Sequence, residues 1–311
     1  MENTFGAFLI VMGFGAAWQF FPQLPDRVAI RAAIGAIVLN VFLPALSFHV
    51  LYNAPLNEEL WIVPTVSAVV CLSTLAVAWA IYESWFKASQ GKFTKASFGA
   101  MLLGAAWCNA TYLGLPTVTL LLGDAYARVP ILYDLLAITP LLLTLGASVG
   151  AYYGETHEQS NLASATRSIL KLPPLWAAVA GVLLNALHVP LPQVFLNACK
   201  IAGSAVAPVM IFSVGLALRF SSLNTVVWIV PAVGLKLLFA PTVAYFTARL
   251  LGLSGDAFAA TLLEAAMPTM VLTMVVADKY KLDSELLAQT IAVSTVLSFI
   301  TIPFLWNFLK S

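Results

Sequence analysis

Two acidic residues stand inside long apolar stretches of the sequence, where a charge needs a chemical reason. Glu264 lies four residues before Pro268, and Asp134 lies near the start of another apolar run. A carboxylate at the middle of a membrane costs roughly several kcal/mol and usually marks an ion path or a proton relay. Hard cations take oxygen ligands from carboxylates, amides and free backbone carbonyls. We therefore expect Glu264 and Asn109 to form a cation site, unless a protonated Glu264 only bonds to a neighbouring helix.

Four further ionisable or polar residues lie in or next to apolar stretches. Asp134 and Thr139 would complete the same cation site from the adjacent helix, unless Asp134 lies close enough to the membrane face to be solvated. A proton-coupled mechanism would use the same two acids. Lys236 is expected to snorkel towards the interface or to pair structurally, rather than to bind a substrate carboxylate. His49 is expected to be a hydrogen-bonded structural residue.

A Pro-Thr dipeptide occurs in the middle of two apolar runs, as Pro116-Thr117 and Pro268-Thr269. Proline removes a backbone donor and clashes with the preceding turn, and it is favoured at the first position of a helix. We expect both prolines to open a second half-helix, whose positive N-terminal end points at an anion at the membrane midplane. The residues expected to contact this anion are Asn109, Gly114, Pro116, Thr117, Pro268, Thr269, Thr273, Ser47 and Ser213.

The elements that carry these residues are predicted to be membrane-spanning helices. Hydrophobic residues make up 61% of the 311 residues and charged residues only 9%, against about 25% charged in a soluble domain. A spanning helix needs about 20 mainly apolar residues. Ten segments of this sequence fit: 4–22, 29–52, 59–85, 97–122, 128–152, 173–190, 193–218, 224–251, 256–279 and 285–309.

The basic residues predict how these helices are oriented, because cytoplasmic loops carry an excess of Lys and Arg. Ten basic residues lie in the turns after the odd-numbered helices and three on the opposite side, so both termini are expected outside the cytoplasm. The ten are Arg27, Arg31, Lys87, Lys92, Lys95, Arg167, Lys171, Arg219, Lys279 and Lys281, and the three are Arg128, Arg249 and Lys310.

The two halves of the chain have prolines at matching positions. Pro44 and Pro208 each follow a polar residue by four positions and precede a phenylalanine by four, and the Pro-Thr pairs recur in the fourth helix of each half. Five helices per half is an odd number, so the second half must enter the membrane with opposite topology, as in many secondary transporters. We predict a first repeat at 1–152, a cytoplasmic linker at 153–172 and an inverted repeat at 173–311.

The sequence resembles the auxin efflux carrier family, which includes plant PIN proteins and bacterial malonate- and malate-type permeases. The resemblance covers nearly the whole chain. It is carried by Asn109-Ala-Thr-Tyr-Leu-Gly114-Leu-Pro116, by Ala265-Ala-Met-Pro268 and Ala277-Asp-Lys-Tyr280, and by the closing stretch from Val293 to Pro303.

This resemblance implies a ten-helix fold shared with the bile acid sodium symporters, in which helices 4 and 9 are unwound and cross. It also implies a scaffold and a transport domain, each drawn from both repeats, elevator-type movement of an organic anion, and a homodimer formed through the scaffold half. The family pattern does not generally call for an acid at Glu264. The bile acid symporters have a crossover glutamate that ligates sodium, and Cys108-Asn109 resembles their helix 4 break.

The function expected from these features is secondary active transport of a small organic anion, either a carboxylate or dicarboxylate or an auxin-like acid. The coupling ion is sodium, with proton-coupled or uncoupled transport as the alternatives. An intramembrane enzyme would need a nucleophile with its base or a metal cluster, and no such motif occurs in the sequence. We expect no cofactor beyond the coupling ion, and no nucleic-acid partner at a net charge of +1. The location expected is the plasma membrane, the inner membrane of a bacterium.

Overall fold

The described part of the chain is helical, as predicted for an all-α membrane protein. The computed structural model describes residues 2–21, 23–89, 91–156, 162–217 and 226–310, so Arg219, residues 157–161 of the predicted linker and the edges of the spans 193–218 and 224–251 lie outside the described residues. Within these ranges, six helical stretches are long and apolar enough to cross a membrane. They are Arg27–Tyr52, Glu59–Ala88, Asp124–Tyr153, Gln193–Ala217, Val226–Leu250 and Ser284–Lys310.

The other four predicted spans are shorter or interrupted helices. The first span is α1 (Glu2–Ala17) followed by a 3₁₀ turn (Trp18–Phe20), and the sixth is α11 (Pro173–Ala186). The fourth span is divided into α5 (Lys95–Ala106) and α6 (Leu115–Leu122), and the ninth into α16 (Gly255–Ala265) and α17 (Thr273–Tyr280). The count of ten spanning helices and the inverted repeat therefore stay predictions.

Side-chain caps fix where two of these helices begin. The carboxylate of Asp26 accepts hydrogen bonds from the backbone N–H groups of Val28 (2.9 Å) and Ala29 (3.0 Å) at the start of α2 (Arg27–Ile37). The hydroxyl of Thr94 accepts one from the backbone N–H of Ser97 at the start of α5. Each cap supplies a partner to N–H groups that have none within the helix.

Four prolines in the middle of spans are each preceded by a π-helical turn that ends two residues before the ring. A proline ring clashes with the carbonyl four residues before it and leaves that carbonyl without its usual donor. A π turn widens the helix locally at the place where this carbonyl lies, and such turns account for many helix distortions. The π turns and their prolines are Val38–Phe42 with Pro44, Ala110–Gly114 with Pro116, Asp134–Ile138 with Pro140, and Leu235–Phe239 with Pro241.

This pattern corrects the prediction that Pro116 and Pro268 open the second half-helices. The fourth span breaks at residues 107–109, and helical structure resumes at Ala110, so Pro116 lies inside the second half-helix. The ninth span breaks at residues 266–272, so Pro268 lies within the break and α17 begins five residues later, at Thr273. The π turn before Pro116 accommodates the ring, and for this reason that proline does not end a helix.

The helices form two groups that meet along a seam. We call α1, α2, α3 (Leu43–Tyr52), α11, α12 (Gln193–Ser204) and α13 (Val206–Ala217) the panel. The remaining helices form the body, which holds the largest hydrophobic core. They are α4 (Glu59–Ala88), α5, α6, α7 (Arg128–Tyr133), α8 (Thr139–Leu141), α9 (Ala147–Tyr153), α10 (Leu162–Leu170), α14 (Val226–Gly234), α15 (Ala240–Leu250), α16, α17 and α18 (Ser284–Lys310).

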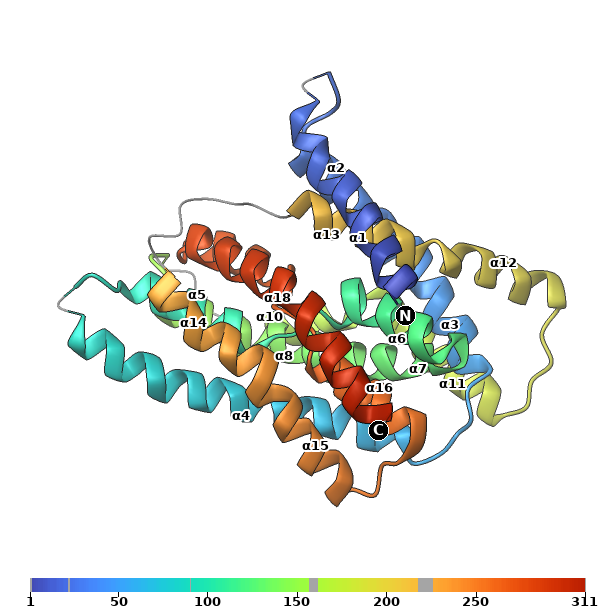
Figure 1. Cartoon of the computed structure of the whole chain (residues 1–311). Helices are drawn as coiled ribbons and strands as arrows, with labels where there is room; N and C mark the ends of the chain where they lie inside the picture. Colours follow the sequence, from blue (N-terminus) through green and yellow to red (C-terminus); the bar gives the residue numbers. More distant parts are fainter. Residues whose placement is uncertain (1, 22, 90, 157–161, 218–225, 311) are drawn as a thin grey trace.

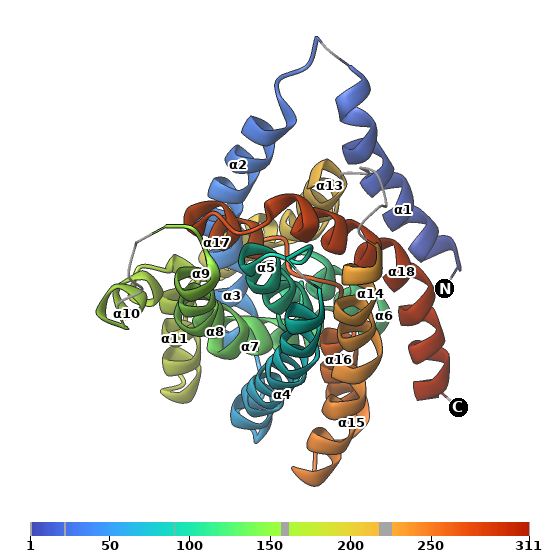
Figure 2. The ribbon, with the colours of Figure 1, turned by 90° about the vertical axis from the view of Figure 1, so that its left-hand side faces the viewer.

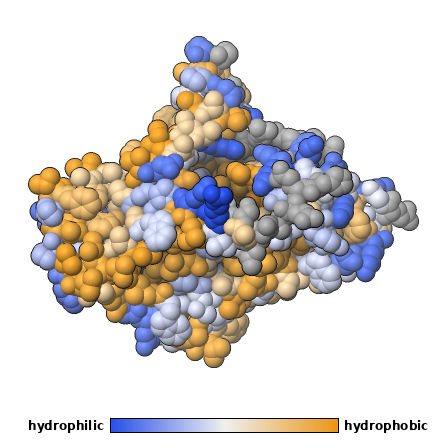
Figure 3. All heavy atoms as spheres, turned by 180° about the vertical axis from the view of Figure 1, so that it is seen from behind, coloured by the Kyte–Doolittle hydropathy of each residue, from blue (hydrophilic) through white to orange (hydrophobic). Residues whose placement is uncertain are grey.

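Both ribbon views agree with this division. The panel occupies the top and right of Figure 1, while α4, α14 and α15 lie on the opposite side of the molecule. After a quarter turn, α1 and α2 diverge from a common tip above the body, with α13 between them and the body (Figure 2). Seen from behind, the outer surface is largely hydrophobic, with hydrophilic residues gathered in patches (Figure 3). Large apolar side chains such as Val194, Leu250 and Phe304 are more than three-quarters exposed, as a lipid-facing surface requires.

Glycines allow two panel helices to approach closely. A Cβ atom at Gly215 of α13 would lie 2.0 Å from the Met12 carbonyl oxygen of α1, and one at Gly15 of α1 would lie 2.2 Å from the Phe212 carbonyl oxygen of α13. Small residues at membrane helix interfaces permit this kind of backbone contact. The α1–α13 contact therefore depends on the absence of side chains at these two positions.

We expect Gly215→Ala to destabilise the panel, because the added methyl group overlaps backbone that cannot move aside easily. Overpacking of this kind typically costs about 1–3 kcal/mol. Thermal unfolding of the purified protein in detergent measures the effect as a lower midpoint. Gly13→Ala in α1 is the matched control, since no atom lies within 4 Å of a Cβ there. Equal midpoints for the two variants would contradict the proposed contact.

Candidate functional site

The breaks in the fourth and ninth spans meet and pair with each other. Cys108 and Thr269 form an antiparallel bridge. The backbone N–H of Asn109 donates to the carbonyl of Pro268 at 2.8 Å, and the N–H of Met270 donates to the carbonyl of Trp107 at 2.9 Å. These bonds satisfy backbone groups that water would otherwise have to reach inside a membrane. We call this pairing of residues 107–109 with 268–270 the crossing.

Hydrogen bonds from Thr269 join the crossing to α5 and to α18. The hydroxyl of Thr269 donates to the Gly104 carbonyl in the last turn of α5 at 2.7 Å. The backbone N–H of Thr269 donates to the hydroxyl of Ser294 in α18 at 3.1 Å. Neither Gly104 nor Ser294 was predicted as a site residue, because their role depends on which carbonyl and which N–H the break exposes.

Glu264 lies in the last turn of α16 with its carboxylate directed at the other broken helix. The residue is 0% exposed, and neither carboxylate oxygen has a hydrogen-bond partner among the described residues. A Cβ atom at Gly114 would lie 2.3 Å from one of these oxygens and 2.4 Å from the other, so only a glycine leaves space for the carboxylate. The N–H of Gly114 in turn donates to the Asn109 carbonyl at 3.1 Å. The structure therefore places Glu264 against Gly114, which the backbone of the π turn joins to Asn109.

Asn109 is the second polar group at the crossing that lacks a partner. It is buried, and in the part of the chain that the structure describes its side-chain Nδ2 makes no hydrogen bond. Nearby in the sequence, the indole N–H of Trp107 is also buried without a partner among the described residues. Buried polar groups are nearly always hydrogen bonded, so a cluster of unpaired ones indicates a place built for a ligand. Trp107 was not predicted, because an apolar residue in an apolar run gives no signal of its own.

Asp134 is held by two threonine hydroxyls instead of facing solvent. It is 3% exposed, and its carboxylate accepts hydrogen bonds from Thr139 at 2.7 Å and from Thr111. The alternative that Asp134 is solvated at the membrane face is therefore wrong. Thr111, in the π turn of the fourth span, joins Asp134 to the crossing and was not predicted.

The predicted hydroxyl contacts to substrate have other partners in this structure. Thr117 donates to the Leu113 carbonyl, Thr269 to that of Gly104 and Thr273 to that of Met270. Their oxygens keep the capacity to accept, but their donor hydrogens are used. Ser47 and Ser213 are both buried in the panel, and the hydroxyl of Ser47 has no partner among the described residues.

Lys236 does not snorkel. It is 1% exposed, and its ammonium group donates to the Ala106 carbonyl at the end of α5 at 3.3 Å. Its four-carbon side chain is thus directed inward to the broken helix and not outward to the interface. His49 is half-buried in α3 and lines a cavity, with its ring Nδ1 unpartnered among the described groups.

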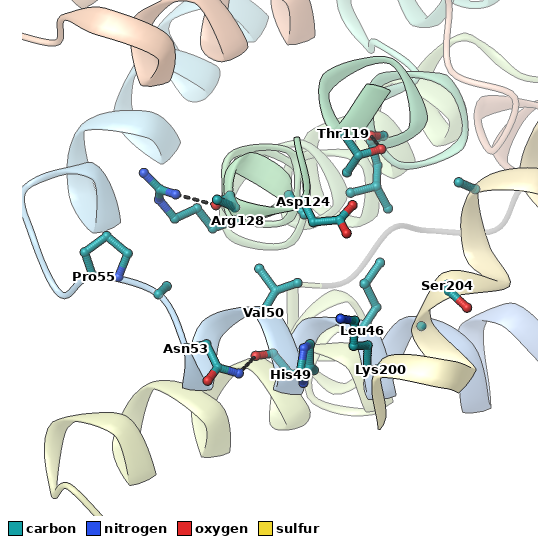
Figure 4. Close-up of a pocket in the computed structure, with 16 residues that line it drawn as sticks. Leu46, His49, Val50, Asn53, Pro55, Thr119, Asp124, Arg128, Lys200 and Ser204 are labelled. Carbon is teal, nitrogen blue, oxygen red and sulfur yellow. Dashed lines mark hydrogen bonds between the residues drawn. The ribbon is translucent and has the colours of Figure 1, made fainter. Parts of the chain in front are cut away.

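Two cavities open along the seam between panel and body. The first, of about 440 Å³, lies between α3 and α12 on one side and the residues from α6 to α7 on the other; we call it the Lys200 cavity. In Figure 4, Asp124 points into this cavity from the body, opposite His49 and Lys200 of the panel. The second, of about 360 Å³, is lined by Val28, Arg31 and Ala217 of the panel and by Val271, Met274 and Asp278 of the body; we call it the Arg31 cavity.

The two cavities are lined by residues of different half-helices next to the crossing. Leu115 and Thr119 of α6 line the Lys200 cavity, whereas Val271 and Met274, at and after the ninth-span break, line the Arg31 cavity. Apolar residues of panel and body also pack together at the seam, where Leu115 and Ala127 form one cluster with Val38, Leu43, Val206 and Met210. The cavities along the seam thus reach residues of both broken helices.

The whole chain is similar to known membrane transport proteins. The model of a family described as membrane transport protein matches residues 7–306. An uncharacterized transporter of Methanothermobacter thermautotrophicus is 31% identical over 279 residues, which cover 89% of this chain and 88% of that protein. An uncharacterized transporter of Methanocaldococcus jannaschii is 26% identical over 250 residues, covering 79% and 78%.

A crossing of two broken helices, cavities along a seam and a lipid-facing surface are the features expected of a carrier. With a family match over nearly its full length, the chain is an integral membrane protein and belongs to the membrane transport protein family, the auxin efflux carrier family that its sequence resembles.

Proposed function

We propose that this protein is a secondary active transporter of a small organic anion and that sodium, bound at Glu264, drives the transport. The observation that carries the proposal is the fully buried Glu264 carboxylate, which has no hydrogen-bond partner in the described chain. An uncompensated buried charge is strongly destabilising, so this group needs a cation or a proton during each cycle.

The oxygens around Glu264 suit a hard cation. Its two carboxylate oxygens are donors that such an ion prefers, and we expect the side-chain oxygen of Asn109 and the carbonyls of the ninth-span break that accept no hydrogen bond to add to them. Asp134, bonded to Thr111 and Thr139, adds negative charge close to the crossing. A proton on Glu264 is the alternative, and it would compensate the same charge without any ligand geometry.

The crossing also has partial positive charges and hydrogen-bond donors, which suit an organic anion. Helical structure begins again at Ala110 and at Thr273, and the N-terminal end of a helix carries a partial positive charge. The Asn109 amide has two N–H donors that no described group uses. With a cation at Glu264, a carboxylate held by these donors lies beside a compensated acid and not beside a second uncompensated negative charge.

The seam supports an elevator-type movement. Panel and body share an apolar cluster that includes Leu43, Leu115 and Met210, whose contacts are not directional. The body would slide along the panel and expose the crossing first to one cavity and then to the other. On this proposal the panel is the scaffold, through which two copies would associate, and both termini face away from the cytoplasm of the plasma membrane. The halves 1–152 and 173–311 would be the inverted repeats.

Replacing Glu264 with glutamine is expected to abolish sodium-driven uptake. A coupling between two sites is typically worth about 5- to 150-fold in affinity, and this stimulation should disappear when the charge does. The measurement is uptake of labelled dicarboxylates and bile-acid-like anions into proteoliposomes, with and without an inward sodium gradient. Glu58→Gln, at an exposed acid before α4, is the control and should retain the stimulation. Equal uptake with and without sodium in the wild type, together with full activity of Glu264→Gln, would sink the proposal.

Gly114→Ala should have a comparable effect without changing any charge. Its methyl group would occupy the position of the Glu264 carboxylate, with contacts of 2.3–2.6 Å that force this group away from the crossing. We expect sodium stimulation of uptake to fall by about tenfold, within the usual range of coupling energies. Gly234→Ala in α14 is the matched control, because no atom lies within 4 Å of a Cβ there. If Gly114→Ala transports like the wild type, the carboxylate does not act from this position.

A further inference from the structure

Lys236 is a buried cation that the transport mechanism so far leaves without a role. Its side chain is 1% exposed, in the π turn Leu235–Phe239 of the eighth predicted span. The ion pairs found among the described residues join Lys87 to Glu83 and Arg128 to Glu59, so neither acid of the crossing forms one with Lys236. A lysine at this depth is costly unless its charge is compensated by another group.

The compensating group is the broken end of α5. A helix C-terminus carries a partial negative charge on its unpaired carbonyls, and cations are stabilised there. Three neighbouring carbonyls at this end have donors from elsewhere: Gly104 from the Thr269 hydroxyl, Trp107 from the Met270 N–H, and Ala106 from the Lys236 ammonium. Of these three donors, only Lys236 brings a full charge.

The broken end of α16 is arranged in the opposite way. The N–H groups of Ala266 and Met267 donate to the carbonyls of Leu262 and Glu264, so this end is closed by its own backbone. Its last turn carries the Glu264 carboxylate, and no basic side chain of the described chain bonds to that carboxylate. The end of α5 therefore has a cation bonded to its carbonyl, whereas the end of α16 carries an acid without a partner; the second acid, Asp134, is bonded to the Thr111 and Thr139 hydroxyls.

We propose that Lys236 is a built-in cation of the crossing: its ammonium neutralises the α5 arm and leaves Glu264, on the α16 arm, as the one site for an exchangeable cation. The inference deepens the proposed function and rests on it, since it limits the transporter to one sodium ion per cycle. Lys236 is a positioning residue, because it touches neither the sodium ion nor the anion.

This assignment has a consequence that structural damage would not produce. Like charges buried in the same site repel each other, and a repulsion of about 1.4 kcal/mol changes an affinity about tenfold. A charged Lys236 therefore weakens sodium binding at Glu264 while it holds α5. Removing its charge should make sodium bind about tenfold more tightly, even though the protein becomes less stable.

The test is equilibrium binding of ²²Na⁺ to the purified full-length protein. We expect one sodium ion per wild-type chain, none in Glu264→Gln, and binding about tenfold tighter than wild type in Lys236→Met. Methionine keeps much of the length and the apolar body of lysine but has no charge. Lys92→Met, at an exposed lysine after α4, is the control for a change in net charge and should bind sodium as the wild type does. Gel filtration and the unfolding midpoint show whether each variant is folded.

The outcomes separate the two proposals. Sodium binding by the wild type that is lost in Glu264→Gln, with unchanged or weaker binding in Lys236→Met, overturns the role of Lys236 and leaves the proposed function in place. Two sodium ions per wild-type chain overturn it as well. No sodium binding to the wild type overturns sodium coupling and this inference together. If Lys236→Met does not fold, Lys236→Gln is measured in its place, and the same direction of change is required.

Discussion

A chain that interrupts two helices inside a bilayer leaves backbone groups that neither lipid nor a continued helix can satisfy. Here the two interruptions satisfy each other, through the bonds from Asn109 N–H to Pro268 O and from Met270 N–H to Trp107 O. This pairing fixes the ends of four half-helices at one place. The two helix N-termini, the two C-termini, the Glu264 carboxylate and the Lys236 ammonium all take their positions from it. The site therefore depends on this backbone pairing. The hydrogen bonds between the two breaks define the geometry in which the charged side chains are placed.

The sequence predicted the helical class, the approximate spans and the neighbourhood of both breaks, because apolar length and proline spacing are local signals. The proline spacing placed the start of the second half-helix at Pro116, seven residues beyond the end of the interruption at Asn109, whereas the resemblance to the bile acid symporters placed the break at Cys108-Asn109, where the structure has it. A proline breaks a helix only if the preceding turn cannot widen, and the π turn Ala110–Gly114 does widen. No local pattern distinguishes these cases, since the choice depends on the partner strand that pairs with residues 107–109.

The residues of the candidate site also divide into those with a local sequence signal and those whose role depends on a partner in space. Glu264 and Asn109 could be found from sequence, because an acid and an amide in apolar runs are anomalous by themselves. Thr111, Trp107 and Ser294 could not, since a hydroxyl or an indole in a membrane helix is common and gains its role only from the group it faces. Lys236 was expected either to snorkel to the interface or to pair structurally. Its sequence position allowed both directions, and only the Ala106 carbonyl shows that the side chain turns inward.

On the proposed mechanism, the fixed charges also explain why the anion needs the cation. The cluster at the seam that includes Leu43, Leu115 and Met210 is apolar and offers no compensation for a net charge during sliding. Glu264, Asp134 and Lys236 together give the empty crossing one net negative charge when all three are ionised. A monovalent anion alone raises this to two negative charges, whereas an anion with sodium leaves it at one. Sodium therefore lowers the cost of carrying the anion across the seam, and that is the coupling a symporter needs.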